Sequence, residues 1–303
     1  MAGRPLEAAS YAGARALNAN GMTLPTDFDL DDFVQRVLAE DLGSGGDVTS
    51  KSTIAADARF TAEMNSREAI VVAGLDIASA FFRALDPEVE IEQPVADGYR
   101  AGPGAVLMRL SGNARAMLAA ERSALNTLQH LSGVATLVRR YVDAIEGTGA
   151  VLIDTRKTLP GLRSLEKYAV RMGGAHNHRM RLDDGVLIKD NHVAVCGGVA
   201  EAVRAAKAAN TGLQVQVEVD RIGQIEPALD AGADRLLLDN MPRAVLREAV
   251  ALVAGRVPLE ASGGVNLETI RAIAETGVDF ISVGRITQSA PAVDIGLDYV
   301  LNR

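Results

Sequence analysis

Basic side chains are concentrated between residues 156 and 189 of this 303-residue chain. They are Arg156, Lys157, Arg163, Lys167, Arg171, His176, His178, Arg179, Arg181 and Lys189, opposed by Glu166, Asp183 and Asp184. Because the whole chain has a formal net charge of −8, this dense cationic segment indicates a local pocket for a small, highly charged anion. For Arg163, Lys167 and Arg171, which have helical spacing, a solvated helix face is the simpler interpretation.

Two glycine-containing turns could hold a phosphate. Glu260-Ala-Ser-Gly-Gly264 precedes a predicted helix at 267–275, and Phe280-Ile-Ser-Val-Gly284 follows one unit later. Glycine lets backbone N–H groups approach an anion closely, and a helix N-terminus favours negative charge. Either turn alone could need glycine only for its geometry. Two in succession favour a phosphate site.

Glu218 and Asp239 are carboxylates at the ends of two successive apolar runs. Paired carboxylates serve as general acid and base or hold a divalent cation. Mg²⁺ usually takes one or two carboxylates alongside water and substrate phosphates. With a phosphate site expected nearby, we predict that these two residues hold Mg²⁺, the alternative being structural ion pairs with arginines.

Other potential ligands are few. His176-Asn-His178 has the spacing of half a zinc site, but no further cysteine or histidine completes it. We expect His178 to belong to the anion pocket and His130 and His192 to be structural. Cys196, the only cysteine, excludes an intramolecular disulfide; a small buried side chain is a simpler interpretation than a catalytic thiol.

The elements that must position these residues differ between the two halves of the chain. From residue 150 onward, apolar runs that end in polar residues alternate with helical segments, which predicts strands at 151–153, 186–188, 215–219, 236–238, 257–260 and 280–283. Continuous leucine and β-branched runs are typical of buried parallel strands. We predict an incomplete α/β barrel, with a doubly wound open sheet as the alternative. In such barrels the carboxyl ends of the strands carry the chemistry.

The first half mixes strands and helices, which suggests an antiparallel sheet with helices packed on it. Its predicted strands are 59–64, 69–72, 88–94 and 105–111, and its predicted helices are 31–40, 75–85 and 114–146. Asp29 or Asp31 is the expected N-cap of the first helix. A break is possible in the long helix at Ser132-Gly133.

Composition excludes several classes of protein. The acidic charge argues against a duplex nucleic-acid binder. No apolar run reaches the roughly 18 to 20 residues that would cross a membrane, and the first residues lack the apolar core of a signal peptide. The cytoplasm is therefore the expected compartment.

A series of segments, in this order, resembles the quinolinate phosphoribosyltransferase family from about Phe28 onward. They are Glu40-Asp-Leu-Gly-Ser-Gly-Gly-Asp-Val-Thr49, Glu121-Arg-Ser-Ala-Leu-Asn126, Asp154-Thr-Arg-Lys-Thr158, Gly173-Gly-Ala-His-Asn-His-Arg179, Leu187-Ile-Lys-Asp-Asn-His192, Val217-Glu-Val-Asp220, Leu237-Leu-Asp-Asn240 and Glu260-Ala-Ser-Gly-Gly264. A single tetrapeptide would mean little, but an ordered set of this size is specific.

This resemblance implies an N-terminal α/β sandwich domain, at 27–130, followed by an incomplete parallel α/β barrel, at 131–286. Residues 1–26, which the resemblance does not cover and which are rich in Ala, Gly and Asn, would be a flexible leader. Residues 287–303 would be a segment that packs back on the sandwich domain. The implied activity joins quinolinate to phosphoribosyl pyrophosphate with Mg²⁺. It gives nicotinate mononucleotide, pyrophosphate and CO₂ in NAD biosynthesis.

The resemblance also assigns residues to roles. Carried over by motif, the substrate-binding residues are Arg122, Thr155, Arg156, Lys157, His178, Arg179, Lys189, Glu218, Asp239, Ser262, Gly263, Gly264 and Gly284. Those implied as catalytic are Lys157, His178, Glu218 and Asp239. In this family the arginine at the position of Arg122 enters the active site of the neighbouring subunit, which implies a homodimer.

Three other functions stay open. The nearest is a paralogous phosphoribosyltransferase-like protein with another anionic substrate. A Schiff-base lyase is the second, since Lys189 ends a predicted barrel strand. The third is a non-catalytic regulator that binds phosphate.

Overall fold

The structure is a computed structural model that describes Leu24 and residues 28–300. The predicted leader, residues 1–26, therefore lies outside the described residues except for Leu24. The chain forms two compact units. The sandwich unit comprises the described residues of Leu24–Asp143, Lys157–His176 and Arg285–Arg303. The barrel unit comprises Ala144–Arg156 and Asn177–Gly284.

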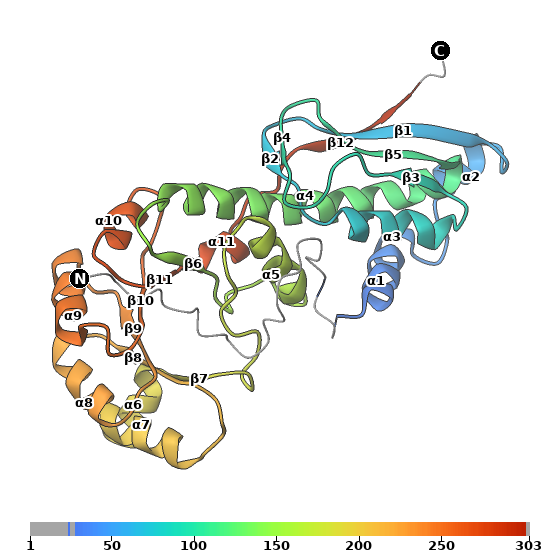
Figure 1. The fold of residues 1–303 in the computed structure, drawn as a ribbon. Helices are drawn as coiled ribbons and strands as arrows, with labels where there is room; N and C mark the ends of the chain where they lie inside the picture. Colours follow the sequence, from blue (N-terminus) through green and yellow to red (C-terminus); the bar gives the residue numbers. More distant parts are fainter. Residues whose placement is uncertain (1–23, 25–27, 301–303) are drawn as a thin grey trace. The chain divides into compact units, whose positions relative to one another are not determined.

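The sandwich unit is built on a four-stranded antiparallel sheet in the order β12-β1-β5-β3. These strands span Ile295–Tyr299, Arg59–Ser66, Val106–Asn113 and Glu90–Glu92. Along β1 every second residue from Ala62 to Ser66 is buried, as expected where one face of a sheet is covered. Helices α3 (Leu75–Leu85) and α4 (Ala114–Ala144) lie against the sheet, and Ser79 of α3 contacts Met108 of β5 (Figure 1).

Smaller elements complete this unit. They are α1 (Leu30–Leu42), α2 (Val48–Thr53), β2 (Ile70–Val71), β4 (Arg100–Ala101), α5 (Arg163–Met172) and α11 (Arg285–Gln288). Asp29 caps α1, since its side chain accepts the N–H of Asp32, so of the two expected caps the first is confirmed.

The long helix α4 is continuous, so the break considered at Ser132-Gly133 does not occur. A Cβ at Gly133 would lie 2.1 Å from the carbonyl oxygen of Pro291. The Ser132 hydroxyl accepts the N–H of Ala73 at 3.0 Å. Small residues stand here because other backbone segments pass close to the helix.

The barrel unit contains a six-stranded parallel sheet in the order β6-β11-β10-β9-β8-β7. The strands span Val151–Ile153, Phe280–Ser282, Leu259–Ser262, Arg235–Asp239, Val215–Val219 and Val186–Ile188. The first strand, β6, pairs with the last, β11, as in a sheet that curls round on itself. In the described sheet the two edge strands, β6 and β7, do not pair with each other, so the barrel is not closed. This confirms the prediction of an incomplete barrel.

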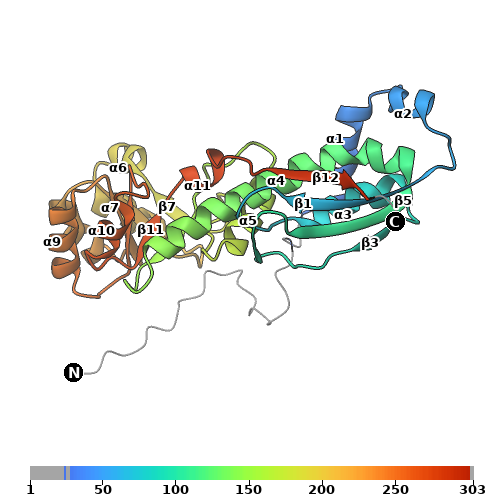
Figure 2. The same ribbon diagram turned by 90° about the horizontal axis from the view of Figure 1, so that it is seen from above.

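Alternate residues of these strands face opposite sides of the sheet. Val217, Leu236, Leu238 and Ile281 are among the fully buried side chains of one face. The helices that follow the strands are α6 (Asp190–Cys196), α7 (Val199–Ala208), η1 (Ile222–Gln224), α8 (Ile225–Asp230), α9 (Arg243–Val253) and α10 (Ile270–Ala274). Figure 1 shows α8, α9 and α10 on the outer side of the curved row of strands, and Figure 2 shows α6 beside α7 and α9 beside α10. The other face carries polar residues.

Two expectations about burial are wrong. Lys167 is only 1% exposed, so the α5 face that carries it is not solvated. The side chain lies in a run of buried residues from Leu165 to Val170, and its polar contacts take the place of solvent. Cys196 is exposed at the end of α6, a short helix in which no residue is buried, so it is not the small buried side chain that was expected. Among the described residues there is no helix long and apolar enough to cross a membrane.

Candidate active site

The carboxyl ends of the barrel strands carry five of the predicted site residues. Lys189 follows β7 and, by the register of β7 with β8, is level with Glu218. Asp239 ends β9 and lies opposite Ser262 at the end of β10. Gly284 follows β11 after one further residue. We call these five residues the rim, since parallel strands bring their carboxyl ends to one edge of the sheet.

The two rim carboxylates influence each other. Glu218 and Asp239 are both half-buried. Burial raises the pKa of the Glu218 carboxyl above its ordinary value, and the negative charge of Asp239 raises this pKa further. The positive charge of Lys189 opposes the shift. The carboxylates are thus close enough to repel, and a bound cation would relieve that repulsion.

The turn after β10 needs glycine for a steric reason. Gly263 has a φ of +95°, and a Cβ there would lie 2.1 Å from the side-chain oxygen of Asn240. Asn240 also donates its backbone N–H to the Ser262 carbonyl oxygen at 2.9 Å. At Gly264, which has a φ of +64°, the space beside the α-carbon is open. The open side of Gly264 leaves room for an anion next to the backbone.

A buried aspartate holds the segment that carries His178. Asp154 follows β6 and is fully buried. Its carboxylate accepts the backbone N–H of His178 at 2.8 Å and the side-chain amide of Asn177 at 2.6 Å. This carboxylate therefore ties the segment at 177–178 to the end of the first barrel strand.

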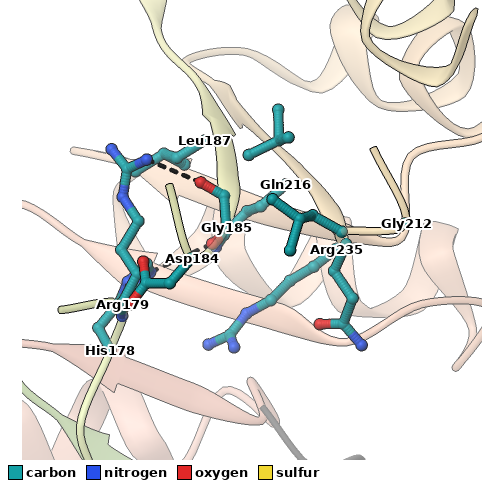
Figure 3. A pocket seen from close by; sticks show the side chains of 11 residues that line it. His178, Arg179, Asp184, Gly185, Leu187, Gly212, Gln216 and Arg235 are labelled. Carbon is teal, nitrogen blue, oxygen red and sulfur yellow. Dashed lines mark hydrogen bonds between the residues drawn. The ribbon is translucent and has the colours of Figure 1, made fainter. Parts of the chain in front are cut away.

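Arg179 is held by hydrogen bonds both at its backbone and at its guanidinium group. Its backbone N–H donates to the Nδ1 atom of His178 at 2.8 Å, and its guanidinium Nη1 donates to the carbonyl oxygen of Gly185 at 2.9 Å. Arg179 lines a cavity of about 180 Å³ together with His178 and Arg235 (Figure 3). Two guanidinium groups and an imidazole around one cavity suit a carboxylate-bearing ligand.

Three buried polar residues on the concave face of the strands did not enter the predicted site. They are Gln216 of β8, Arg235 of β9 and Glu260 of β10, none more than 4% exposed. Gln216 Nε2 donates to Glu260 Oε2 at 2.8 Å, and Arg235 Nη2 lies 2.8 Å from the same oxygen. Each of them precedes a rim residue of its own strand by two or four positions, so its side chain lies on the same face of the sheet as that rim residue but deeper along the strand. We call these three residues the floor.

The floor has an electrostatic consequence. Burial raises the pKa of the Glu260 carboxyl, but the nearby His178 ring, 3.6 Å away, and the charge of Arg235 outweigh burial and bring this pKa to about 2. Arg235 lies over the ring of Phe280, with its guanidinium carbon 3.9 Å from the ring centre. The sequence did hold a signal for these residues: each is polar within an apolar run, in the two-residue period of the rim.

The other predicted residues are divided between the units. Thr155 and Arg156 end the first segment of the barrel unit, and both are partly buried. Lys157 belongs to the sandwich unit and is exposed, and its carbonyl oxygen accepts the hydroxyl of Thr287 at 2.7 Å. Arg122 is an exposed residue of α4 in the sandwich unit and lines a small hollow with acidic residues of α1.

Of the other three histidines, His192 contacts a rim residue, and it does so through the backbone of Lys189. His130 Nε2 is 3.0 Å from the buried carboxylate of Glu166, and the Nδ1 atom of His192 accepts the backbone N–H of Lys189. His176 is exposed. The described residues contain no group of three or more histidine, cysteine, aspartate or glutamate side chains arranged for a metal. The rim pair, Glu218 and Asp239, does fit a cation that completes its shell with water and phosphate.

Fold and site together define an open α/β-barrel protein whose strand ends combine a lysine, paired carboxylates and a glycine turn. The chain belongs to the quinolinate phosphoribosyl transferase family. The model of the family's N-terminal domain matches residues 47–132, and the model of its C-terminal domain matches residues 134–298.

Relatives of known name resemble most of the chain. The nicotinate-nucleotide pyrophosphorylase [carboxylating] of Mycobacterium leprae is 44% identical over 275 residues, which cover 88% of this chain and 96% of the relative. The probable enzyme of the same name from Bacillus subtilis is 41% identical over 87% of this chain and 91% of its own. The solved nicotinate-nucleotide pyrophosphorylase of Francisella tularensis is 40% identical, with a TM-score of 0.88 over 93% of this chain and 100% of that one.

Proposed function

We propose that this protein is a quinolinate phosphoribosyltransferase. It transfers the phosphoribosyl group of phosphoribosyl pyrophosphate to the ring nitrogen of quinolinate, and releases pyrophosphate and CO₂ to leave nicotinate mononucleotide for NAD synthesis. The observation that carries this proposal is the rim, where a lysine, two carboxylates and glycine turns stand at the ends of five strands of one sheet. Relatives about 40% identical carry the name of this activity.

Quinolinate has two adjacent carboxylates, and cationic side chains are suited to hold them. Planar guanidinium groups bind carboxylates in a bidentate manner. We assign this role to Arg156 and Arg179, with Lys189 as a further cation and Thr155 as a neutral hydrogen-bonding partner. A substrate with one carboxylate, such as nicotinate, would lose part of these contacts and bind poorly.

The phosphoribosyl group would be bound at the rim. We assign its 5′-phosphate to Ser262, Gly263, Gly264 and Gly284. At Gly264 the open side of the backbone supports this assignment. Glu218 and Asp239 would face the ribose, whose anomeric carbon gains positive charge as pyrophosphate departs. Carboxylates near that carbon stabilise such charge.

Glu218 and Asp239 are also the residues that would hold Mg²⁺. The mutual repulsion of these half-buried carboxylates supports this assignment, because it favours a bound cation. When bound there with substrate phosphates, Mg²⁺ would supply positive charge that stabilises the departing pyrophosphate.

Loss of CO₂ needs no organic cofactor. Once the ring nitrogen is alkylated, the positively charged ring takes up the electron pair that the leaving carboxylate releases. A proton must then reach the ring carbon that bore this carboxylate. We assign its delivery to the ammonium group of Lys157, an exposed side chain next in sequence to Arg156.

The decisive assay incubates the purified protein with quinolinate, phosphoribosyl pyrophosphate and Mg²⁺, and follows CO₂ and nicotinate mononucleotide together. Formation of both products is expected, and much slower reaction with nicotinate. Binding of both substrates without pyrophosphate release would instead favour a phosphate-binding regulator. Turnover with another anionic acceptor but not with quinolinate would favour the paralogous transferase, and borohydride trapping of a substrate at Lys189 a lyase.

We further propose a homodimer in which Arg122 acts in the active site of the partner subunit, and a cytoplasmic location. The exposure of Arg122 on α4 is compatible with this role. Arg122→Ala and Glu218→Ala should each be inactive alone but recover activity when mixed, because one kind of site in the mixed dimer then has both residues intact. Verified mixed dimers without any activity would exclude the shared site.

A further inference from the structure

The hydrogen bonds of His178 define which of its ring nitrogens carries the proton. Nδ1 accepts the backbone N–H of Arg179 at 2.8 Å. A backbone N–H can only donate, so Nδ1 has no proton in this arrangement, and the proton of the neutral ring is on Nε2. Nε2 lies 3.2 Å from Gln216 Oε1 and 3.6 Å from Glu260 Oε2.

From the His178 ring, each hydrogen bond is donated toward the floor: from His178 to Gln216, and from Gln216 to Glu260. We call this chain of hydrogen bonds the relay. Gln216 accepts from His178 through its side-chain oxygen and donates through its nitrogen to Glu260. Glu260 is ionised and also pairs with Arg235. Reversing the Gln216 amide would point its NH₂ group at the His178 ring and its oxygen at the Glu260 carboxylate, so the carboxylate sets the orientation of the amide and, through it, the tautomer of His178.

Burial gives this relay its rigidity. His178 is 7% exposed, and the three floor residues are 4% exposed or less. Water cannot replace a lost partner at such positions, so a buried polar group without its partner is costly and alternative orientations are disfavoured. The ring of His178 is therefore held by the floor on one side and holds the backbone of Arg179 on the other.

We propose that Glu260, supported by Arg235, is a positioning residue for the quinolinate half of the reaction: through Gln216 it holds His178 as the Nε2–H tautomer, which fixes the backbone that presents Arg179 to the substrate carboxylates. This inference rests on the proposed function. It gives His178 a positioning role in place of the catalytic role that the family resemblance implies for it.

The relay acts on Arg179 directly through the His178 ring, whereas its effect on the glycine turns assigned to the sugar phosphate passes through Glu260, which hydrogen-bonds Ser282, two residues before Gly284. Loss of the relay should therefore weaken quinolinate binding far more than binding of phosphoribosyl pyrophosphate. A general loss of stability would not separate the two substrates in this way. A rise in the KM for quinolinate without a matching rise in the KM for phosphoribosyl pyrophosphate is therefore the result that identifies the relay.

The kinetic test uses Glu260→Gln and Gln216→Met, which keep side-chain size but break the relay at two points. Each is expected to raise the KM for quinolinate about tenfold or more, as for loss of a hydrogen bond that orients a charged group. The KM for phosphoribosyl pyrophosphate should change less than about twofold by the same reasoning. Val203→Ala is the matched control, since Val203 is a fully buried residue of α7 outside the relay. It should lower stability and leave both KM values unchanged.

A second measurement does not depend on activity. The chain has four histidines, so ¹⁵N-histidine labelling gives a small set of ring signals, and His178→Gln identifies those of His178. At pH 7.5 the native protein should show Nε2–H and an unprotonated Nδ1 for His178. In folded Gln216→Met, this pattern should be lost or mixed.

The outcomes separate this inference from the proposed function. A native protein that does not form nicotinate mononucleotide would remove the proposed function, whatever the tautomer of His178. An active native protein with His178 as the Nδ1–H tautomer, or with both KM values rising equally in the two relay variants, would overturn the positioning role alone.

Discussion

The rim and the floor share one face of the barrel strands but differ in how their charges are compensated. At the floor, Arg235 and Glu260 are almost completely buried and are paired with each other. At the rim, Glu218 and Asp239 are half-buried, and the negative charge of Asp239 adds to the effect of burial in raising the pKa of Glu218. A buried charge must find its partner within the fold, whereas a rim charge can be left for a ligand to compensate. The floor should therefore govern stability as well as the position of His178, and the rim should govern the chemical step.

Arg235→Met should produce the largest effect, on stability. It leaves Glu260 buried without its cation, and breaking a buried pair in this way lowers the free energy of unfolding by about 3 to 5 kcal/mol. Urea unfolding followed by circular dichroism measures the change. The double variant Arg235→Met/Glu260→Met should recover most of the loss, because it removes both charges. A single variant as stable as the native protein would contradict the importance of this pair.

Asp239→Asn should have a comparable effect, but on activity. It removes a charge from the rim, and loss of one group that stabilises transition-state charge lowers kcat/KM about 10²- to 10³-fold. Unfolding free energy should stay equal or rise, since the repulsion on Glu218 is relieved. Steady-state kinetics and urea unfolding of the same sample give both numbers. A destabilised Asp239→Asn with normal kcat/KM would reverse the division between rim and floor.

The floor should also make stability sensitive to acid. The pKa of Glu260 in the fold is about 2, below its ordinary value of 4.5, so the ionised form stabilises the fold. This contribution is complete above pH 4.5 and is lost as the pH falls from there toward 2, and it amounts to about 3 kcal/mol. Unfolding curves between pH 7 and pH 3 should show the loss in the native protein. In Glu260→Gln this component should be absent, and an equal pH dependence in both proteins would refute it.

A surface ion pair of the same unit should have the smallest effect. Lys207 and Asp234 lie 2.7 Å apart, but their side chains are 38% and 36% exposed. Lys207→Met should change the free energy of unfolding by only about 0 to 1 kcal/mol, because solvent and salt screen exposed pairs. Kinetics should be unchanged. A loss as large as that of Arg235→Met would show that burial does not distinguish the two pairs.

Much of the fold could be predicted from the sequence, because hydrophobic period and strand-end chemistry act locally. The strands at 151–153, 186–188 and 215–219 and the helix at 75–85 have the predicted bounds. The rim was also accessible, since each of its residues follows or ends an apolar run. These signals need no knowledge of what packs against the strand.

The residues that escaped prediction depend on contacts distant in sequence. Gly133 looked like a helix breaker, but its role depends on Pro291, which approaches it from elsewhere in the chain. Lys167 looked solvated because its spacing alone does not reveal what covers it. Glu260 was read only as the start of a phosphate turn, since its partners, Gln216 and Arg235, lie on other strands.

The pairing of β12 with β1 has a consequence for how the chain folds during synthesis. Residues Ile295–Tyr299 form the edge strand beside β1, with Ala62 opposite Tyr299 and Ser66 opposite Ile295. A ribosome makes this strand only after the whole barrel unit has been translated. Until then the outer edge of β1 has no strand beside it, and pairing of this edge with another nascent chain would compete with correct folding.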